Sequence, residues 1–176
     1  MSSTPHNIPD PAPHSDPTDR VSVSLHARAK INLALAVAEA SAQTDGYHPI
    51  ASWMARLDLA DELMVTRLEA DRLSRYAILW HAEAPVRSPI DWSITKDLAV
   101  RAHLMLEEHA GRSLPVQLKL DKRIPVGGGL GGASADAAAM LVAVNDLFNL
   151  GLSHEELAEL STSLGSDVAY CLMDTP

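Results

Sequence analysis

The sequence lacks the features of several protein classes. Its 176 residues include one cysteine, Cys171, so no internal disulfide can form and a reducing compartment such as the cytoplasm is favoured. No apolar run reaches the roughly 18 residues of a membrane-spanning helix, and no signal-peptide pattern opens the chain. The 14 Lys and Arg are outnumbered by 23 Asp and Glu, and the net charge of −9 argues against non-specific binding to nucleic acid or membrane surfaces. We therefore expect a cytoplasmic protein with neither partner.

Glycine is also scarce and very unevenly distributed. Five of the nine glycines fall within Ile124–Ala138, IPVGGGLGGASADAA. An alternating apolar segment, 116–121, precedes this stretch and predicts a strand, and an alanine-rich segment, 133–148, follows it and predicts a helix. A glycine loop between a strand and a helix start suits a phosphate, because free N–H groups and the helix dipole point at the anion. A simple linking turn is the alternative, but it needs fewer glycines.

The remaining pattern predicts one domain, residues 21–176, after a disordered tail at residues 1–20 that holds five of the eleven prolines. Expected strands are 21–25, 30–37, two within 53–68 separated by a turn at Asp61–Glu62, 116–121 and 168–172. Expected helices are 93–111, 133–148 and 153–165, with Gly111 and Gly165 closing the first and last, a capping box of Ser153 and Glu156, and an irregular connection at 69–89.

Three polar positions stand out within these elements. Alternation in the strand 30–37 puts Lys30 and Asn32 on one side, where they form either a site or a solvated strand end. Asp167 lies between an expected helix and an expected strand, where a turn-forming aspartate is common. Ser134 stands where its hydroxyl could act as a helix N-cap. The residues alone leave these alternatives open.

Five stretches together resemble the GHMP kinases: P-V-G-G-G-L-G-G-A-S-A-D-A-A, A-R-A-K-I-N-L, D-G-Y-H, L-G-S-D-V-A-Y and the segment 53–68, which is similar to the family's F-L-D-L-G-D-E-L. The resemblance implies an α+β fold, the GHMP kinase N-terminal domain, in which helices pack on a mixed sheet. A ribosomal-protein domain shares this fold. The resemblance also implies transfer of a phosphoryl group from ATP to an alcohol, with Mg²⁺ as the second cofactor.

Roles for individual residues follow from the same resemblance. Lys30 and Asp167 are the implied catalytic residues, with Asp167 as the base. Asn32, Tyr47 and His48 are the implied substrate contacts, and Ser134 also reaches the metal. The implied nucleotide site consists of Lys122, Pro125, Gly127, Gly128, Gly129, Leu130, Gly131, Gly132, Ala133 and Ser134.

The resemblance has departures and a boundary. Asp97 stands where the family has an adenine-binding asparagine, so Trp92 could stack on the base instead, and Ala135 replaces a second serine. D-G-Y-H resembles the branch whose small-molecule partner is a cytidyl sugar-alcohol diphosphate. The match runs from about Ala27 to about Leu172, the family's N-terminal domain only. We therefore expect the C-terminal domain to be absent from this chain, which would be a fragment or would work with a separate C-terminal polypeptide.

Three other functions remain open at this point. One is a GHMP kinase of the homoserine or mevalonate type, against which D-G-Y-H argues. Another is a non-catalytic ATP-binding fragment. The last is an RNA-binding module, because a ribosomal-protein domain shares the expected fold, although the net charge of −9 opposes it.

Overall fold

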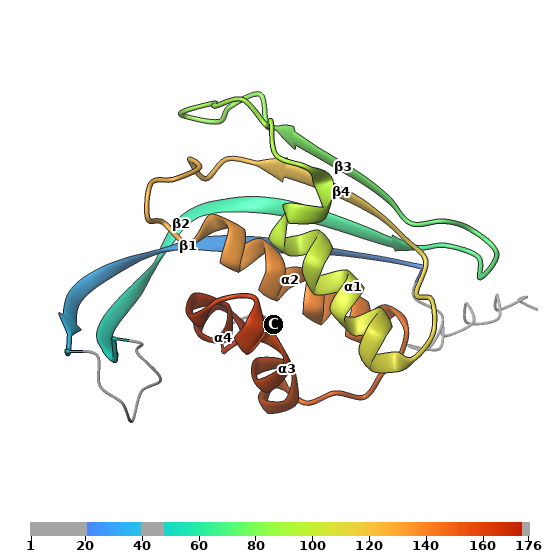
Figure 1. Cartoon of the computed structure of the whole chain (residues 1–176). Helices are drawn as coiled ribbons and strands as arrows, with labels where there is room; N and C mark the ends of the chain where they lie inside the picture. The colour runs from blue at the N-terminus through green and yellow to red at the C-terminus, as the bar shows by residue number, and fades with distance from the viewer. Residues whose placement is uncertain (1–20, 40–47, 174–176) are drawn as a thin grey trace, which may run out of the picture.

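The fold is a four-stranded mixed sheet covered on one face by helices (Figure 1). The computed structural model describes residues 21–39 and 48–173, so the expected tail lies outside it. The strands are β1 (Ser22–Val37), β2 (Ile50–Arg67), β3 (Arg75–Trp80) and β4 (Val116–Lys122), and the helices are α1 (Leu98–Ala110), α2 (Gly132–Leu147), α3 (His154–Leu160) and α4 (Ser166–Leu172). The sheet order is β1-β2-β4-β3, with only the β3–β4 pair parallel. The α+β class with a mixed sheet is confirmed.

The core forms between α2 and the sheet. In β4, Val116, Leu118 and Leu120 are fully buried, as their alternation predicts. The helix α2 is buried without a break from Ala135 to Val144, because its alanines let it pack closely between the sheet and α1 and α4. Among the described residues, no helix has the length and apolar character needed to cross a bilayer.

The strands β1 and β2 form one long antiparallel ribbon, which corrects two expectations. The chain does not break between residues 25 and 30, and Asp61 and Glu62 do not form a turn. Both acidic residues lie inside β2, where Glu62 pairs with His26 of β1 and with Asp121 of β4. The two acidic residues suggested a turn, but β1 and β4 on either side provide hydrogen-bond partners for their backbone groups.

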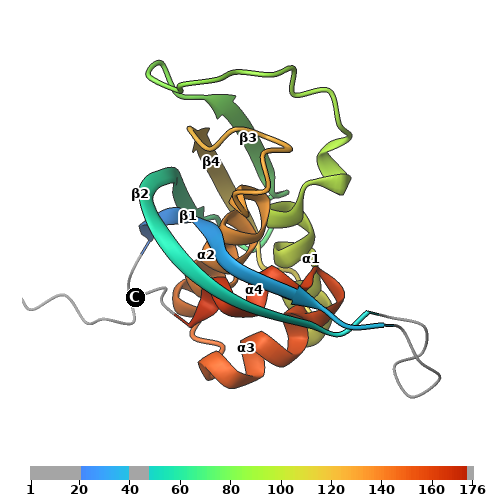
Figure 2. The same ribbon diagram turned by 90° about the vertical axis from the view of Figure 1, so that its left-hand side faces the viewer.

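The outer end of this ribbon reaches beyond the helices (Figure 2). The pairing register shifts between Arg28 and Lys30 and again between Asn32 and Ala34, so the simple alternation of side chains does not continue along the whole strand. Large apolar side chains on this outer end are more than half exposed: Leu33, Leu35, Val37, Ile50 and Trp53.

Other element boundaries also differ from expectation. The expected irregular connection at 69–89 contains β3, and α1 begins at Leu98 after a short 3₁₀ turn. The expected strand 168–172 is the helix α4, because Val168, Cys171 and Leu172 recur at helical spacing and form its buried face. Gly165 precedes α4 and does not close α3, which ends at Leu160 with Ser161 as its C-cap. The capping box that opens α3 is confirmed, as is Gly111 at the end of α1.

Candidate functional site

The glycine loop connects β4 to α2 and depends on backbone angles that favour glycine. Gly127, Gly129 and Gly131 have φ of 76°, 70° and 71°, in the left-handed region. Gly131 is also tightly packed, because a Cβ there would lie 2.9 Å from the side-chain carbons Cγ and Cε of Lys30. Gly131 is the N-cap of α2, so the expectation that Ser134 would be the N-cap is wrong.

A cavity of about 320 Å³ lies over this loop. All the residues that the sequence assigns to a nucleotide site line it, together with Trp92, Lys96, Asp97 and Leu98 from the start of α1. The first N–H groups of α2 have no acceptor within the helix, and Gly132, Ala133 and Ser134 contribute to the wall. The cavity therefore offers N–H donors and a helix N-terminus to an anion.

Lys30 brings the loop, the first strand and the last helix together. Its Nζ lies 2.9 Å from Oδ2 of Asp167 and donates to Oδ1 of Asn32 at 2.8 Å. Its backbone N–H donates to the carbonyl of Leu130 at 2.8 Å, which ties the glycine loop to β1. Lys30 is buried, whereas the Asp167 side chain is 29% exposed in the first turn of α4. One carboxylate can therefore contact both the buried ammonium and an incoming molecule.

Ser52 extends this arrangement, although no sequence pattern pointed to it. The amide Nδ2 of Asn32 donates to Oγ of Ser52 at 2.6 Å, and Ser52 donates in turn to the carbonyl of Ala34 at 3.0 Å. These two hydrogen bonds orient the Asn32 amide so that its Oδ1 faces Lys30. The prediction that Lys30 and Asn32 project to the same side is confirmed.

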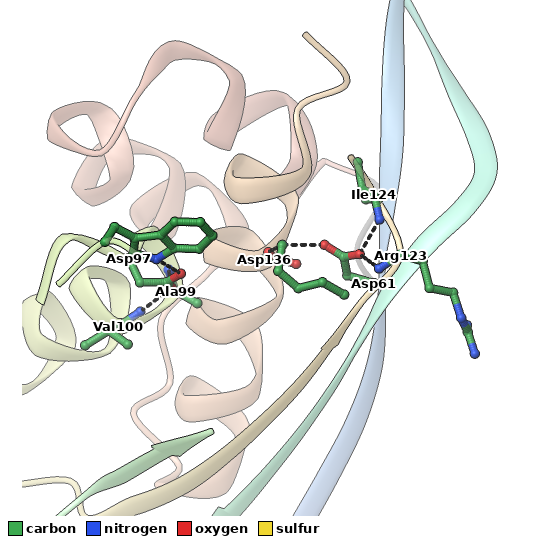
Figure 3. Close-up of polar contacts among 9 residues, drawn as sticks. Asp61, Asp97, Ala99, Val100, Arg123, Ile124 and Asp136 are labelled. Atoms are coloured by element: carbon green, nitrogen blue, oxygen red, sulfur yellow. Dashed lines mark hydrogen bonds and ion pairs between the residues drawn. The ribbon is translucent and has the colours of Figure 1, made fainter. Parts of the chain in front are cut away.

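A second cluster of charges lies buried beside the start of the loop (Figure 3). Nζ of Lys122 lies 2.6 Å from Oδ2 of Asp61 and 2.6 Å from Oδ2 of Asp136. The other oxygen of Asp61 accepts the backbone N–H groups of Arg123 and Ile124. Asp61 therefore anchors the chain where it leaves β4, a role hidden in the sequence by its resemblance to a turn.

This cluster has more acidic than basic groups, because two carboxylates share one ammonium. Burial raises the pKa of Asp136 well above its ordinary value, against the opposing effect of Lys122, and Asp61 adds to the rise. Burial works to lower the pKa of Lys122, but Asp136 and Asp61 outweigh it and raise that pKa. Oδ1 of Asp136 is buried without a hydrogen-bond partner. Lys122 stays charged, and its main contacts are these carboxylates.

Asp97 caps α1 instead of standing inside a helix. Its Oδ1 accepts the N–H groups of Ala99 and Val100, and its Oδ2 accepts Nε1 of Trp92 at 3.2 Å (Figure 3). Both carboxylate oxygens are thus engaged, and the indole of Trp92 is held in the cavity wall by the same residue.

Of the two expected aromatic substrate contacts, the structure describes only His48. Tyr47 lies outside the described residues. His48 lies at the outer end of the ribbon, where Nδ1 is 2.9 Å from the carbonyl of Ala38. Their assignment to a substrate stays a prediction.

Comparison with known proteins agrees with this arrangement. The family model described as "GHMP kinases N terminal domain" matches residues 97–175. A crystal structure of 4-(cytidine 5'-diphospho)-2C-methyl-D-erythritol kinase superposes with a TM-score of 0.65 at 34% sequence identity, covering 86% of this chain and 49% of that one. The chain has the fold of the GHMP kinase N-terminal domain. A homoserine kinase structure from Cytophaga hutchinsonii, at 17% identity and a TM-score of 0.59, shares this fold.

Two curated relatives of this chain share one name. The "4-diphosphocytidyl-2-C-methyl-D-erythritol kinase" of Listeria innocua is 38% identical over 150 residues, which is 85% of this chain and 48% of the relative. The protein of the same name from Bacillus cereus (strain B4264) is 42% identical over 148 residues, 84% of this chain and 47% of the relative. The chain spans about half the length of the curated relatives it matches.

Proposed function

We propose that this chain supplies the ATP-binding half of a kinase that phosphorylates the 2-hydroxyl of 4-diphosphocytidyl-2-C-methyl-D-erythritol in the non-mevalonate isoprenoid pathway. The observation that carries the proposal is the 2.9 Å Lys30–Asp167 ion pair at the edge of the glycine loop. The backbone bond from Lys30 to Leu130 fixes the distance between this pair and the loop. The lone cysteine favours a reducing compartment, and we assign the reaction to the cytoplasm.

The two side chains suit proton removal from an alcohol. The partly exposed carboxylate of Asp167 can accept the hydroxyl proton, and the ammonium of Lys30, 2.9 Å away, holds that carboxylate in place. The same ammonium can offset negative charge that develops on the attacking oxygen and the transferred phosphoryl group. Asn32 holds Lys30 from the other side and so keeps the ammonium at the site.

The residues present fit a nucleotide with a phosphate-bound Mg²⁺. The glycine loop leaves open space where side chains would stand at Gly127 and Gly129, so phosphate oxygens could approach the backbone. Ser134 contributes one hydroxyl to the wall, and no group of three or more His, Cys, Asp or Glu among the described residues could form a separate metal site. Such a donor set suits an ion that keeps waters and phosphate oxygens as ligands. When bound, Mg²⁺ would neutralise phosphate charge.

We also propose that turnover requires the part of the relatives that these 176 residues do not span. The exposed apolar end of the β1–β2 ribbon, at Leu33, Leu35, Val37, Ile50 and Trp53, supports a covering partner. An open site would also weaken the electrostatic stabilisation that phosphoryl transfer needs. The chain alone should bind nucleotide weakly and show no steady turnover.

A coupled ADP-release assay tests both proposals. Residues 1–176 are offered the cytidyl substrate, homoserine and mevalonate in parallel, with and without the half of the Bacillus cereus relative that this chain does not cover. We expect turnover only with the cytidyl substrate and only with both polypeptides. Steady phosphorylation by residues 1–176 alone would refute the need for a partner, and turnover of another acceptor would refute the substrate.

The role of Asp167 is tested in the same assay by Asp167→Asn. This change keeps the shape but removes the proton acceptor, so kcat should fall by roughly 10²–10⁴ while ATP affinity stays unchanged. Asp121→Asn is the matched control, because Asp121 also forms a close lysine pair, at 2.7 Å from Lys119, outside the cavity. Near wild-type turnover in Asp167→Asn would show that this carboxylate is not the base.

A further inference from the structure

Arg56 in β2 binds the last turn of the helix that carries Asp167. Its Nη2 donates to the backbone carbonyls of Tyr170 and Cys171, each at 2.9 Å. Its guanidinium carbon also lies over the Tyr170 ring, 5.1 Å from the centroid. One side chain of the sheet therefore holds the C-terminal end of α4.

The first turn of α4 is held by the direct neighbour of Arg56. Lys30 and Arg56 are cross-strand partners in the β1–β2 register, and Lys30 makes the 2.9 Å ion pair with Asp167. A single cross-strand pair thus contacts both ends of α4, which lies beside the β1–β2 ribbon on the helical side of the sheet (Figure 2). Two contacts to one rigid pair fix the direction of the helix as well as its position.

The seven residues of α4 need such support. Helices this short have little stability of their own, and their last carbonyls lack partners within the helix. A cation at the C-terminal end satisfies these carbonyls and complements the helix dipole. Without it, the direction of Asp167 would depend on the Lys30 contact and on the buried side chains of Val168, Cys171 and Leu172.

We propose that Arg56 is a positioning residue: it orients α4 so that Asp167 meets Lys30 in the geometry required for proton transfer. Its consequence for catalysis rests on the proposed function, but its effect on α4 does not. Arg56 lies in the segment 53–68 that resembles the family, but the resemblance assigns no role to this residue.

The thiol of Cys171 provides a test that needs no catalytic activity. It is the only cysteine of the chain, it is 1% exposed, and its own carbonyl accepts Arg56. Burial raises its thiol pKa to about 11, so the native thiol should react slowly with a disulfide reagent such as DTNB. In residues 1–176 carrying Arg56→Gln, labelling at native pH should be about tenfold faster or more, because charge-assisted hydrogen bonds to the last turn are lost.

Arg67→Gln is the matched control, because Arg67 makes the same kind of contact at the other end of β2. Its Nη1 donates to the carbonyl of Leu147 at 3.2 Å and its guanidinium lies over Phe148, at the end of α2. This variant should lose stability without faster labelling of Cys171. Wild-type labelling in Arg56→Gln, or equal acceleration in both variants, would overturn the proposal. If Arg56→Gln does not fold, Arg56→Lys, which retains the charge and donors, carries the test and should give an intermediate rate.

Turnover gives the second readout, in whichever preparation phosphorylates the cytidyl substrate. Arg56→Gln should lower kcat by roughly 10- to 100-fold with an unchanged KM for ATP, since small misplacement of a reacting group has effects of this size. Faster labelling with unchanged kcat would overturn the positioning role. If no preparation phosphorylates the substrate, the proposed function fails, and the labelling comparison alone decides whether Arg56 orients α4.

Discussion

The buried cluster around Lys122 allows a quantitative test of the structure. Lys122→Met retains the length of the side chain but removes the ammonium that lies 2.6 Å from both Asp61 and Asp136. Two buried carboxylates would then face each other without a cation, and Oδ1 of Asp136 already lacks a partner. Removing one member of a buried ion pair costs about 3–5 kcal/mol, a large part of the roughly 5–15 kcal/mol that stabilises a typical domain.

Urea unfolding followed by circular dichroism measures this loss. With an m value of about 2 kcal/mol/M, the midpoint should fall by roughly 2 M. Lys119→Met is the matched control, because Lys119 lies in the same strand and is 2.7 Å from Asp121, but its side chain is 49% exposed. An exposed pair of this kind contributes about 0–1 kcal/mol, so the control should change the midpoint little.

The loss should also depend on pH in a defined direction. In the variant, burial and mutual repulsion raise the carboxyl pKa values of the native state above those of the unfolded chain. A raised native pKa destabilises the fold above the unfolded pKa, so the deficit relative to wild type should shrink as the pH falls from 7 towards 5. It should shrink by about 1.4 kcal/mol per pH unit for each extra proton that the native variant binds.

Adding Asp136→Asn to Lys122→Met should recover part of the loss at pH 7, because one of the two facing charges is removed. A deficit no larger than that of Lys119→Met, or one that does not shrink on acidification, would show that the cluster is not a buried ion network.

Two further predictions concern the ligands. Gly129→Ala should weaken ATP binding, measured by calorimetry, at least tenfold, whereas the control Gly151→Ala should not. Both glycines have left-handed φ angles, 70° and 73°, and open space at the Cβ position. Equal ATP affinities of the two variants would refute the loop assignment. His48→Ala should raise the KM for the cytidyl substrate much more than the KM for ATP, with exposed His154→Ala as control, and equal effects on both substrates would exclude His48 from a cytidine pocket.

The glycine loop could be predicted from sequence because its determinants are local. The alternation before it, the alanine-rich segment after it and the glycines themselves all lie within about one supersecondary unit. The structure confirms the strand, the loop and the helix there, with boundaries shifted by one residue at each end of the helix. Only Ser134 was misjudged, since the positive φ of Gly131 lets the helix begin earlier.

Errors arose where tertiary contacts decide the outcome. Asp61 and Glu62 interrupt an apolar segment and so suggested a turn. Asp61 is nevertheless buried, because Lys122 and two backbone N–H groups provide partners for its carboxylate. The segment Val168–Leu172 is too short for periodicity to separate strand from helix. Its helical form depends on packing and on Arg56, which lies over a hundred residues earlier.

The Lys30–Asp167 ion pair shows how these two kinds of information combine. Lys30 and Asp167 lie at opposite ends of the described chain, and no local pattern predicts that they meet. Each is placed by a separate constraint: Lys30 by its backbone bond to Leu130 of the glycine loop, and Asp167 by the helix that Arg56 holds. Because Lys30 and Arg56 are cross-strand neighbours, both constraints act through the same point of the sheet. A change at that point should therefore move the glycine loop and Asp167 together.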